Sequence, residues 1–388
     1  MNENRIDSRH IKIHNRGMVF EYILKNHIVS KQDLVTGLHL SLPTVTTNLN
    51  ALVELGLVEG AHSIKYTGGR NAKGFAVVAN ARRAIGINMT AHHMNAVSVN
   101  LLGEVGAVRR ERIAFDMNSE AYLREIGRLV DEIMEEDEIS EEQLLGVGIG
   151  VPGIVSDEGD VVIEGTLPGL KGKTKRQITK YLHHPATLFY DAYAAGYAEM
   201  RVNEKLGNAF YLGLSNTIYG ALIWNHQIYS GDNLHAGDMA HMILYPNSDK
   251  VCSCGNRGCF NCYCSASELD SLTDGNLAAF FALLEQRDEE ATRRFEAYLD
   301  SLALAIHNLR SLLGMKIVLG GYVGAYMEDY LPELLTRVED LDPYHERAKD
   351  YVVPCLSRQE SIAVGTASIH VDWFLGSIAA MDDGTEMM

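Results

Sequence analysis

Five of the six cysteines in this chain lie within thirteen residues, from Cys252 to Cys264. The run Cys252-Ser-Cys254-Gly-Asn-Arg-Gly-Cys259 places three of them around glycine turns. Zn²⁺ takes sulfur and nitrogen ligands in a tetrahedral arrangement, and closely spaced donors allow one short loop to supply most of them. The spacing therefore predicts a metal site, and the residues around this loop are the first place to look for function.

The composition is that of an ordinary globular protein. Of the 388 residues, 46% are apolar and 22% are charged, and the length is sufficient for two or three domains. The N-terminus is polar, and the longest apolar stretch, residues 144–155, is interrupted by Gly and Pro and too short to cross a bilayer. We therefore expect a soluble, cytoplasmic protein with no membrane partner, in which clustered cysteines bind metal more often than they form disulfides.

Charge is distributed unevenly along the chain. Residues 1–80 contain nine Lys and Arg against six Asp and Glu, a balance of +3, whereas the remaining residues contain 25 against 45, or −20. A slightly basic head on an acidic body favours nucleic-acid binding by the head, although ordinary variation explains a balance of this size equally well.

Residues 11–60 show the periodicity of three short helices. Ser41 has the position of the N-cap of the third helix. Apolar residues recur on one face of that helix at Val45, Leu49 and Leu52, and this face should pack against the core. Small hydrogen-bonding side chains occupy the opposite face and its edges, where they suit DNA base edges and phosphates. They are Ser41, Thr44, Thr46, Thr47, Asn48 and Asn50.

Two short β-prone runs follow, on either side of a Gly-Gly turn at residues 68–69. This is the pattern of a hairpin wing, whose basic residues Arg70 and Lys73 are placed to reach a phosphate or the minor groove. Residues 1–80 are therefore predicted to form a winged helix-turn-helix DNA-binding domain. The alternative is a small helical domain with a solvated hairpin that binds no DNA.

From Ala84 onward, short β-prone runs alternate with amphipathic helices, which is typical of an α/β domain. Strands are expected at residues 84–89, 96–105, 108–115, 144–151, 187–190, 209–214, 221–225 and 316–319, and helices at 121–136, 192–200 and 289–313.

Several motifs together point to one family. The most specific is Cys252-Ser-Cys-Gly-Asn-Arg-Gly-Cys259 at its distance from Gly237-Asp-Met-Ala-His241. The others are Ser41-Leu-Pro-Thr-Val-Thr, Thr67-Gly-Gly-Arg70, Val147-Gly-Ile-Gly-Val-Pro-Gly153, Tyr190-Asp191-Ala-Tyr-Ala-Ala and Ile317-Val-Leu-Gly-Gly321. With these motifs nearly the whole chain resembles the ROK family of repressors, uncharacterised frames and sugar kinases.

The resemblance implies an α/β protein in which the winged helix-turn-helix precedes a two-lobed, actin-like (ribonuclease H-like) ATPase-type domain at residues 81–388. A sugar would bind in the cleft between the lobes. Lobe one would hold about residues 81–195 and the C-terminal end, and lobe two about residues 196–365 with the metal loop.

The two loops that hold ATP phosphates in kinases of this family are altered here. Those kinases open the domain with Asp-x-Gly-Gly-Thr-Lys, whereas this chain has Asn88-Met-Thr-Ala-His-His93, without either glycine. The second loop resembles residues 215–221, where one glycine remains and Tyr219 stands where phosphate would approach. We therefore expect no ATP-dependent phosphoryl transfer and no enzymatic activity. A sugar kinase with an accessory head is the alternative.

The resemblance also implies which residues contact the sugar. Asp191 matches the carboxylate that accepts a hydrogen bond from a sugar hydroxyl. Asp238 stands where the family has a Glu, and Asn261 where it has a second Glu, so these expected contacts are altered. His241 is implied to lie near the sugar as well.

The resemblance makes His241 a zinc ligand together with Cys252, Cys254 and Cys259. Four protein ligands make such a zinc ion structural rather than catalytic. Because Cys259 and Cys262 form a Cys-x-x-Cys pair, an all-cysteine site using Cys262 is the alternative. With His241 as the fourth ligand, Cys262 and Cys264 would be free or packed thiols.

These features predict a sugar-responsive DNA-binding transcriptional regulator, in particular a repressor. A single head offers few contacts, so we expect a homodimer or homotetramer that reads two half-sites. Operator DNA and a sugar or sugar derivative are the expected partners, and Zn²⁺ is the expected cofactor. The altered Tyr190, Asp238 and Asn261 leave open a DNA-binding regulator with no sugar ligand.

Overall fold

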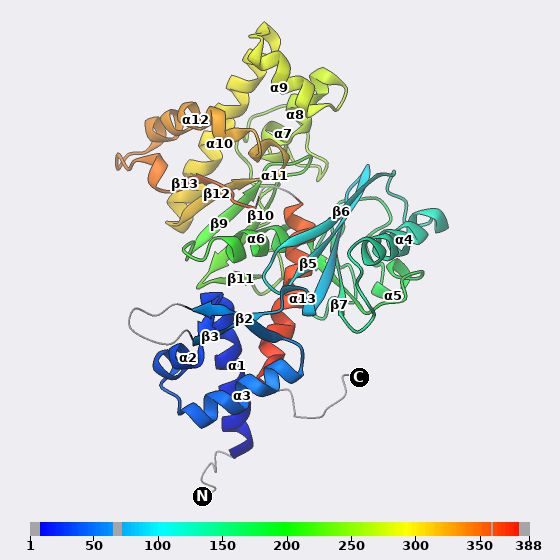
Figure 1. The fold of residues 1–388 in the computed structure, drawn as a ribbon. Coiled ribbons are helices and arrows are strands. Elements are labelled where there is room, and N and C mark those ends of the chain that lie inside the picture. Colours follow the sequence, from blue (N-terminus) through cyan, green and yellow to red (C-terminus); the bar gives the residue numbers. More distant parts are fainter. Residues whose placement is uncertain (1–7, 65–71, 358–359, 380–388) are drawn as a thin grey trace, which may run out of the picture.

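The computed structural model describes residues 8–64, 72–357 and 360–379. It consists of an N-terminal head and a body of two lobes, each built on a five-stranded sheet (Figure 1). The α/β class predicted from the sequence is confirmed. Within the described part of the chain, no helix is long and apolar enough to cross a membrane.

The head contains the three expected helices and a small sheet in the order β1-β3-β2. The Ser30 hydroxyl accepts from the backbone N–H of Asp33, whose carboxylate accepts from the N–H of Ser30, so α2 begins with a capping box. Ser41 caps α3. The elements are α1 (Ser8–Asn26), β1 (Val29–Ser30), α2 (Lys31–Leu38), α3 (Leu42–Glu54), β2 (Val58–Ile64) and β3 (Ala72–Val77).

The first lobe has its strands in the order β6-β5-β4-β7-β8. Side chains alternate across the central strand β4: Ile85 and Ile87 belong to the cluster that contains α4, whereas Gly86 faces α13. The elements are β4 (Arg83–Met89), β5 (His93–Asn100), β6 (Val105–Arg112), α4 (Glu120–Glu136), β7 (Leu144–Val151), α5 (Lys175–Ile178), β8 (Ala186–Tyr190) and α13 (Ser361–Ile378).

The second lobe repeats this strand order as β11-β10-β9-β12-β13. In both sheets the first three strands are antiparallel and the last two run parallel to the central one. Helices α10 and α12 pack on one side of the second sheet, and α6 contacts β9, β10 and β11. The elements are α6 (Asp191–Val202), β9 (Ala209–Gly213), β10 (Tyr219–Trp224), β11 (Gln227–Tyr229), α7 (Asn261–Cys264), α8 (Ser267–Asp270), α9 (Leu277–Glu285), α10 (Glu289–Leu313), β12 (Lys316–Gly320), α11 (Gly321–Gly324), α12 (Met327–Leu341) and β13 (Val352–Pro354).

Helices α6 and α13 pack against each other at the junction of the lobes. A Cβ on Gly365 would lie 1.8 Å from the carbonyl oxygen of Ala194, so the two helices approach to a distance that only glycine allows. Helix α1 of the head contacts α13 as well. The lobe boundaries drawn from the sequence, near residues 195 and 365, both fall inside these helices.

Candidate functional site

Four donor residues lie together on the long segment between β11 and α7. The donor atoms of His241, Cys252, Cys254 and Cys259 all lie within 4.8 Å of one another. His241 Nδ1 is 3.5 Å from Cys252 Sγ, and the sulfurs of Cys254 and Cys259 are 3.7 Å apart. With ordinary zinc bond lengths, a tetrahedral site has edges of about 3.8 Å between sulfurs and about 3.5 Å between sulfur and nitrogen. The cluster is therefore of the right size and chemistry to hold a metal ion.

Cys262 lies outside this group of four donors. Burial, and then the neighbouring Cys252, raise the pKa of the Cys262 thiol to about 11. Burial also raises the pKa of Cys252, but hydrogen bonds from Cys254 and His241 outweigh it and bring that pKa to about 6. Burial also raises the pKa of Cys259 to about 12, although Cys259 belongs to the group, so the distances between the donor atoms and not these pKa values select the donors. Among the described residues, His241 rather than Cys262 completes the donor set.

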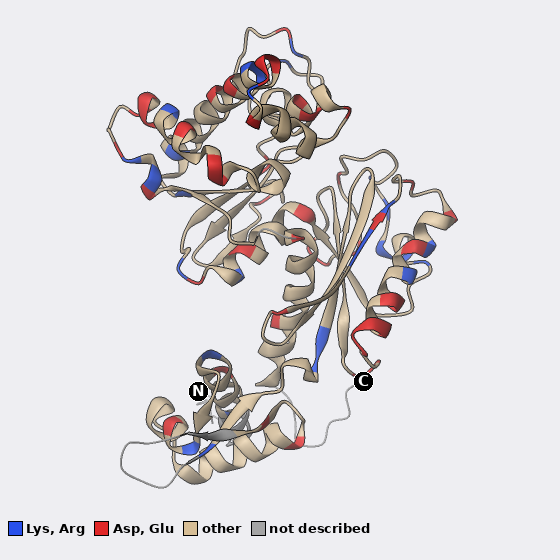
Figure 2. Ribbon diagram, turned by 45° about the horizontal axis from the view of Figure 1, so that its top comes forward, with Lys and Arg blue, Asp and Glu red and all other residues tan. Residues whose placement is uncertain are grey.

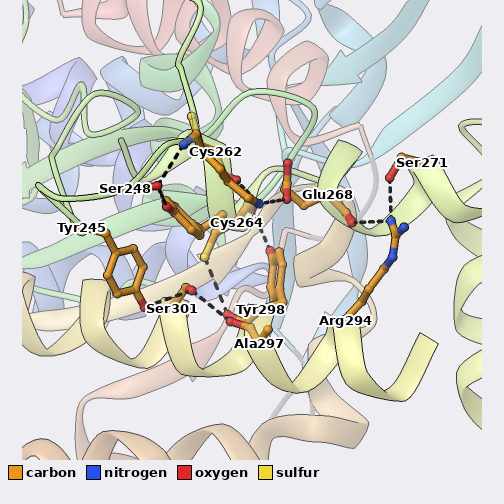
Figure 3. Close-up of polar contacts among 12 residues, drawn as sticks. Tyr245, Ser248, Cys262, Cys264, Glu268, Ser271, Arg294, Ala297, Tyr298 and Ser301 are labelled. Carbon is orange, nitrogen blue, oxygen red and sulfur yellow. Dashed lines mark hydrogen bonds and ion pairs between the residues drawn. The ribbon is translucent and has the colours of Figure 1, made fainter. Parts of the chain in front are cut away.

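The helix that follows the metal loop is fixed to α10. Cys264 is fully buried, and its Sγ lies 3.7 Å from the carbonyl oxygen of Tyr298. The Tyr298 hydroxyl donates in return to the carbonyl oxygen of Cys264 at 2.9 Å (Figure 3). Lys250 of the metal loop donates to the carbonyl oxygen of Cys262 at 3.0 Å and forms an ion pair with Glu268. Cys264 is therefore a packed thiol that helps to hold the loop on the second lobe.

Asp191 is the first residue of α6 and directly follows β8, at the junction of the lobes. Its Oδ1 accepts a hydrogen bond from the N–H of Ala192 at 2.8 Å, and burial raises its pKa to about 7. Burial also raises the pKa of Tyr190 well above its usual value, and the carboxylates of Asp191 and Asp238 raise it further. Both carboxylates are therefore near enough to the Tyr190 hydroxyl to affect its pKa.

Asn261 has a structural partner that the sequence did not indicate. Its Oδ1 accepts a hydrogen bond from the N–H of Ile218 at 2.8 Å, and its own N–H donates to the carbonyl oxygen of Ala240 at 2.9 Å. The residue therefore joins the metal loop to the second phosphate loop and to the segment that carries Asp238 and His241.

The first phosphate loop is closed by its own residues. The Thr90 hydroxyl accepts from the N–H groups of His92 at 3.4 Å and His93 at 3.0 Å, and donates to the carbonyl oxygen of His93. Three backbone donors that such a loop would offer to phosphate, those of Thr90, His92 and His93, are therefore already used. Behind the loop, Asn88 is buried and its Oδ1 has no hydrogen-bond partner among the described residues.

The second phosphate loop is filled by an aromatic side chain. The Tyr219 ring stacks with that of Tyr211 at a centroid distance of 6.3 Å. A Cβ on Gly213 would lie 2.2 Å from the Tyr219 ring, so no space remains between them. Together with the bond from Asn261 to Ile218, this packing leaves both loops closed on protein groups.

The DNA-binding face predicted on α3 is largely accessible. Ser41, Thr47 and Asn50 are exposed, and Thr44 and Thr46 are half-buried. The Ser41 and Thr44 hydroxyls lie 2.8 Å apart and bond to each other. The face thus presents short polar side chains, as predicted.

The positive charge near this face comes from residues outside α3. Helix α3 itself has no Lys or Arg (Figure 2), but Lys31 of α2 donates to the Thr46 hydroxyl at 3.4 Å. Lys73 is exposed on β3. Arg70 lies outside the described residues, so its predicted contact with DNA stays a prediction.

The prediction that Asn48 contacts DNA is wrong. Its side chain is 2% exposed, and its Nδ2 donates to the carbonyl oxygen of Thr44 at 2.9 Å. Asn48 follows Val45 by three positions and precedes Leu52 by four, and this spacing puts it on the core-facing side of the helix.

Comparison with known proteins identifies the family. The model of the ROK family matches residues 84–372. The chain belongs to the ROK family. Within it, the chain is 28% identical over 270 residues to the xylose repressor of Bacillus subtilis (strain 168), a match that covers 68% of each chain.

Solved structures of ROK proteins share the fold. A ROK family transcriptional regulator described as a homologue of the E. coli MLC protein superposes with a TM-score of 0.72 at 19% identity, covering 95% of this chain and 99% of that one. A ROK family glucokinase from Streptomyces griseus, in complex with glucose and AMPPNP, superposes with a TM-score of 0.60 at 18% identity, covering 74% and 98%. The two-lobed fold expected from the sequence is confirmed, and the family contains sugar kinases as well as regulators.

Proposed function

We propose that this chain is a transcriptional repressor whose binding to operator DNA responds to a sugar held between the two lobes. The observation that carries the proposal is the state of the two phosphate loops. In both, backbone N–H groups are bonded to the protein's own side chains, Thr90 and Asn261. A cleft that keeps Asp191 but has closed phosphate loops suits sugar binding without phosphoryl transfer.

The proposed ligand contacts are Asp191, Asp238, His241 and Asn261. The two carboxylates would accept hydrogen bonds from sugar hydroxyls, and the side-chain nitrogen of Asn261 would donate one. His241, with Nδ1 facing the metal cluster, would present Nε2 to the ligand. The similarity to a xylose repressor makes xylose the first candidate.

In this proposal residues 1–80 bind the operator DNA, and residues 81–388 bind the sugar. Short polar side chains at the start of α3 would meet base edges, while the wing would meet the backbone or the minor groove. A homodimer or homotetramer acting in the cytoplasm would read two half-sites. The proposed DNA contacts are Ser41, Thr44, Thr46, Thr47, Asn50, Arg70 and Lys73.

We propose zinc as the resident metal of His241, Cys252, Cys254 and Cys259. Bound zinc would supply a structural cross-link, because all four tetrahedral positions are filled by protein donors. The residues themselves would hold one wall of the cleft in place, since Cys259 lies two positions before Asn261 and His241 lies three positions after Asp238.

The test is a mobility shift on the DNA upstream of the gene for this chain, titrated with xylose, glucose and other sugars. Wild type should bind the DNA, and one sugar should change that binding. Asp191→Asn should bind the same DNA and lose the response, because an amide replaces an acceptor-only carboxylate. Asp131→Asn, at an exposed acid on α4, is the matched control. Intact DNA binding with no response to any sugar would instead favour a regulator without a sugar ligand.

One observation favours a kinase as the second candidate. Burial raises the pKa of Asp191 to about 7, which suits a general base acting on a sugar hydroxyl. Incubation with ATP and the same sugars, with ADP release as the readout, decides between the two. We expect no release above background, and sustained turnover would contradict the proposed function.

A further inference from the structure

Helix α13 runs from the junction of the lobes to the DNA-binding head (Figure 1). At its first end, Glu360 forms an ion pair with Arg110 of β6. At its other end, a Cβ on Gly17 of α1 would lie 2.8 Å from the Cβ of Ala379, directly after the helix. With 18 residues the helix is about 27 Å long. One stiff element therefore touches both the ligand-bearing body and the head.

Helix α6, whose first residue is Asp191, is linked to α13 by a polar joint, which consists of the contacts of Tyr197 and Arg201 with α13. The Tyr197 hydroxyl donates to Asp372 Oδ2 at 2.6 Å, and the Arg201 guanidinium lies 3.0 Å from Asp372 Oδ1. Arg201 also donates to the carbonyl oxygen of Ser368 at 3.1 Å. Both partner residues, Asp372 and Ser368, thus belong to α13 and lie about two to three turns before the contact of Ala379 with the head.

The joint is poorly suited to a purely stabilising role. The Asp372 side chain is 33% exposed and that of Arg201 is 20% exposed, and ion pairs with this much access to water contribute little to stability. Their geometry, by contrast, is specific, because a carboxylate that accepts from two residues one turn apart fixes the register of α6 against α13.

We propose that Asp372 is a positioning residue that couples occupancy of the cleft to operator binding. A ligand that moves Asp191 moves the start of α6, and through Tyr197 and Arg201 this shift is passed to α13 and so to α1. The inference rests on the proposed function, because it requires a sugar at Asp191. Coupling of this kind is a free energy shared by two sites, so it is measurable from either site.

The experiment uses the full chain, xylose, and a labelled duplex selected by the wild type from a random library. The duplex Kd is measured with and without saturating xylose, and the xylose Kd with and without saturating duplex. In wild type, xylose should change the duplex Kd by about tenfold or more. The quantity compared is the ratio of the duplex Kd with xylose to the duplex Kd without xylose. Asp372→Asn, which removes the charge, should bring this ratio to within about twofold of one while the chain stays folded.

Two further variants keep the test decisive. Tyr197→Phe removes one hydroxyl and leaves the ion pair, so it should lower the ratio by a smaller factor without any loss of folding. Gly376→Ala is the control on the same helix, because a Cβ there has nothing within 4 Å, and it should keep the wild-type ratio.

The outcomes separate the two proposals. Variants at Asp372 and Tyr197 that melt like wild type and keep the wild-type ratio would overturn the inference alone. A wild type that binds the duplex but neither binds nor responds to xylose or the other sugars of the panel would overturn the proposed function, and the inference with it.

Discussion

The hairpins at corresponding places in the two lobes, β4–β5 and β9–β10, are closed in different ways. In the first lobe, Thr90 satisfies N–H groups that are its immediate neighbours in sequence. In the second, Ile218 depends on Asn261, which is 43 residues further along and begins α7, directly after the metal loop. One closure is local, and the other depends on a residue that follows the proposed metal site. Loss of metal from that site should therefore loosen the β9–β10 hairpin and leave the β4–β5 hairpin intact.

The largest expected effect comes from Cys259→Ser, which removes a buried donor from the metal cluster. We expect loss of zinc and a fall in the free energy of unfolding on the order of 4 kcal/mol. Metal analysis and thermal unfolding measure both quantities. Hydrogen exchange should show that the Ile218 amide loses protection while the His93 amide keeps it.

Cys262→Ser is the matched control, since that thiol lies in α7, three residues after Cys259, but outside the donor group. It should retain the metal. Release of zinc by Cys262→Ser, with retention by Cys259→Ser, would show that the donor set is wrong and that the comparison of the hairpins has no basis.

A second prediction concerns the first lobe alone. His370 of α13 is 8% exposed, and burial lowers its pKa to about 4 despite a smaller opposing effect of a hydrogen bond to Val147. Because the folded pKa is below the ordinary value of about 6.5, its contribution is complete above pH 6.5 and is lost as the pH falls toward 4. Up to about 3 kcal/mol of stability should disappear over this window.

His370→Gln removes the titrating group and should flatten this dependence. Denaturant unfolding measured from pH 7 to pH 4.5 gives the free energy of unfolding of both chains at each pH. Release of metal by acid affects both chains equally, so it cancels in the difference between their free energies of unfolding. Equal slopes in the two chains would mean that another group is responsible.

A third prediction tests the distant closure directly. Asn261→Ala leaves the N–H of the buried Ile218 without its acceptor and should cost about 1–3 kcal/mol in the free energy of unfolding, with zinc retained. Asn261→Asp keeps an acceptor oxygen and should cost less. A variant as stable as wild type would show that water replaces the bond and that the two loops are not linked.

The smallest effect is expected at the local closure. Thr90→Ala removes the acceptor of exposed N–H groups, which water can then solvate, and should cost about 1 kcal/mol or less. Thr90→Ser keeps the hydroxyl and serves as the control in the same unfolding measurement. A cost at Thr90 above that at Asn261 would reverse the comparison.

Features set by neighbours in the sequence were predictable. The cysteine spacing brings its donors together within one loop, and Ser30 and Ser41 cap helices through bonds that span three residues. Hydrophobic periodicity likewise placed α4 and α10 to within one residue. In each case the determining contacts lie within a single loop, cap or helix.

Features set by distant parts of the chain were not predictable. The third strand was expected at 108–115 but is Val105–Arg112, because its ends depend on pairing with β5, which is irregular between Val97 and Val99. The inward position of Asn48 could have been found from its spacing to Val45. The bond from Asn261 to Ile218, and the contact of α13 with the head, have no local signal.

The packing of the head on α13 bears on how such proteins exchange their DNA-binding parts. Val19 and Ile23 of α1 belong to the same hydrophobic cluster as Val371 and Phe374, near the opposite end of the chain. A head transplanted from a relative would meet a surface shaped for another helix. Recombination that keeps a regulator functional must therefore exchange the coding regions of the head and of α13 together. Otherwise, substitutions in one region must be matched by substitutions in the other.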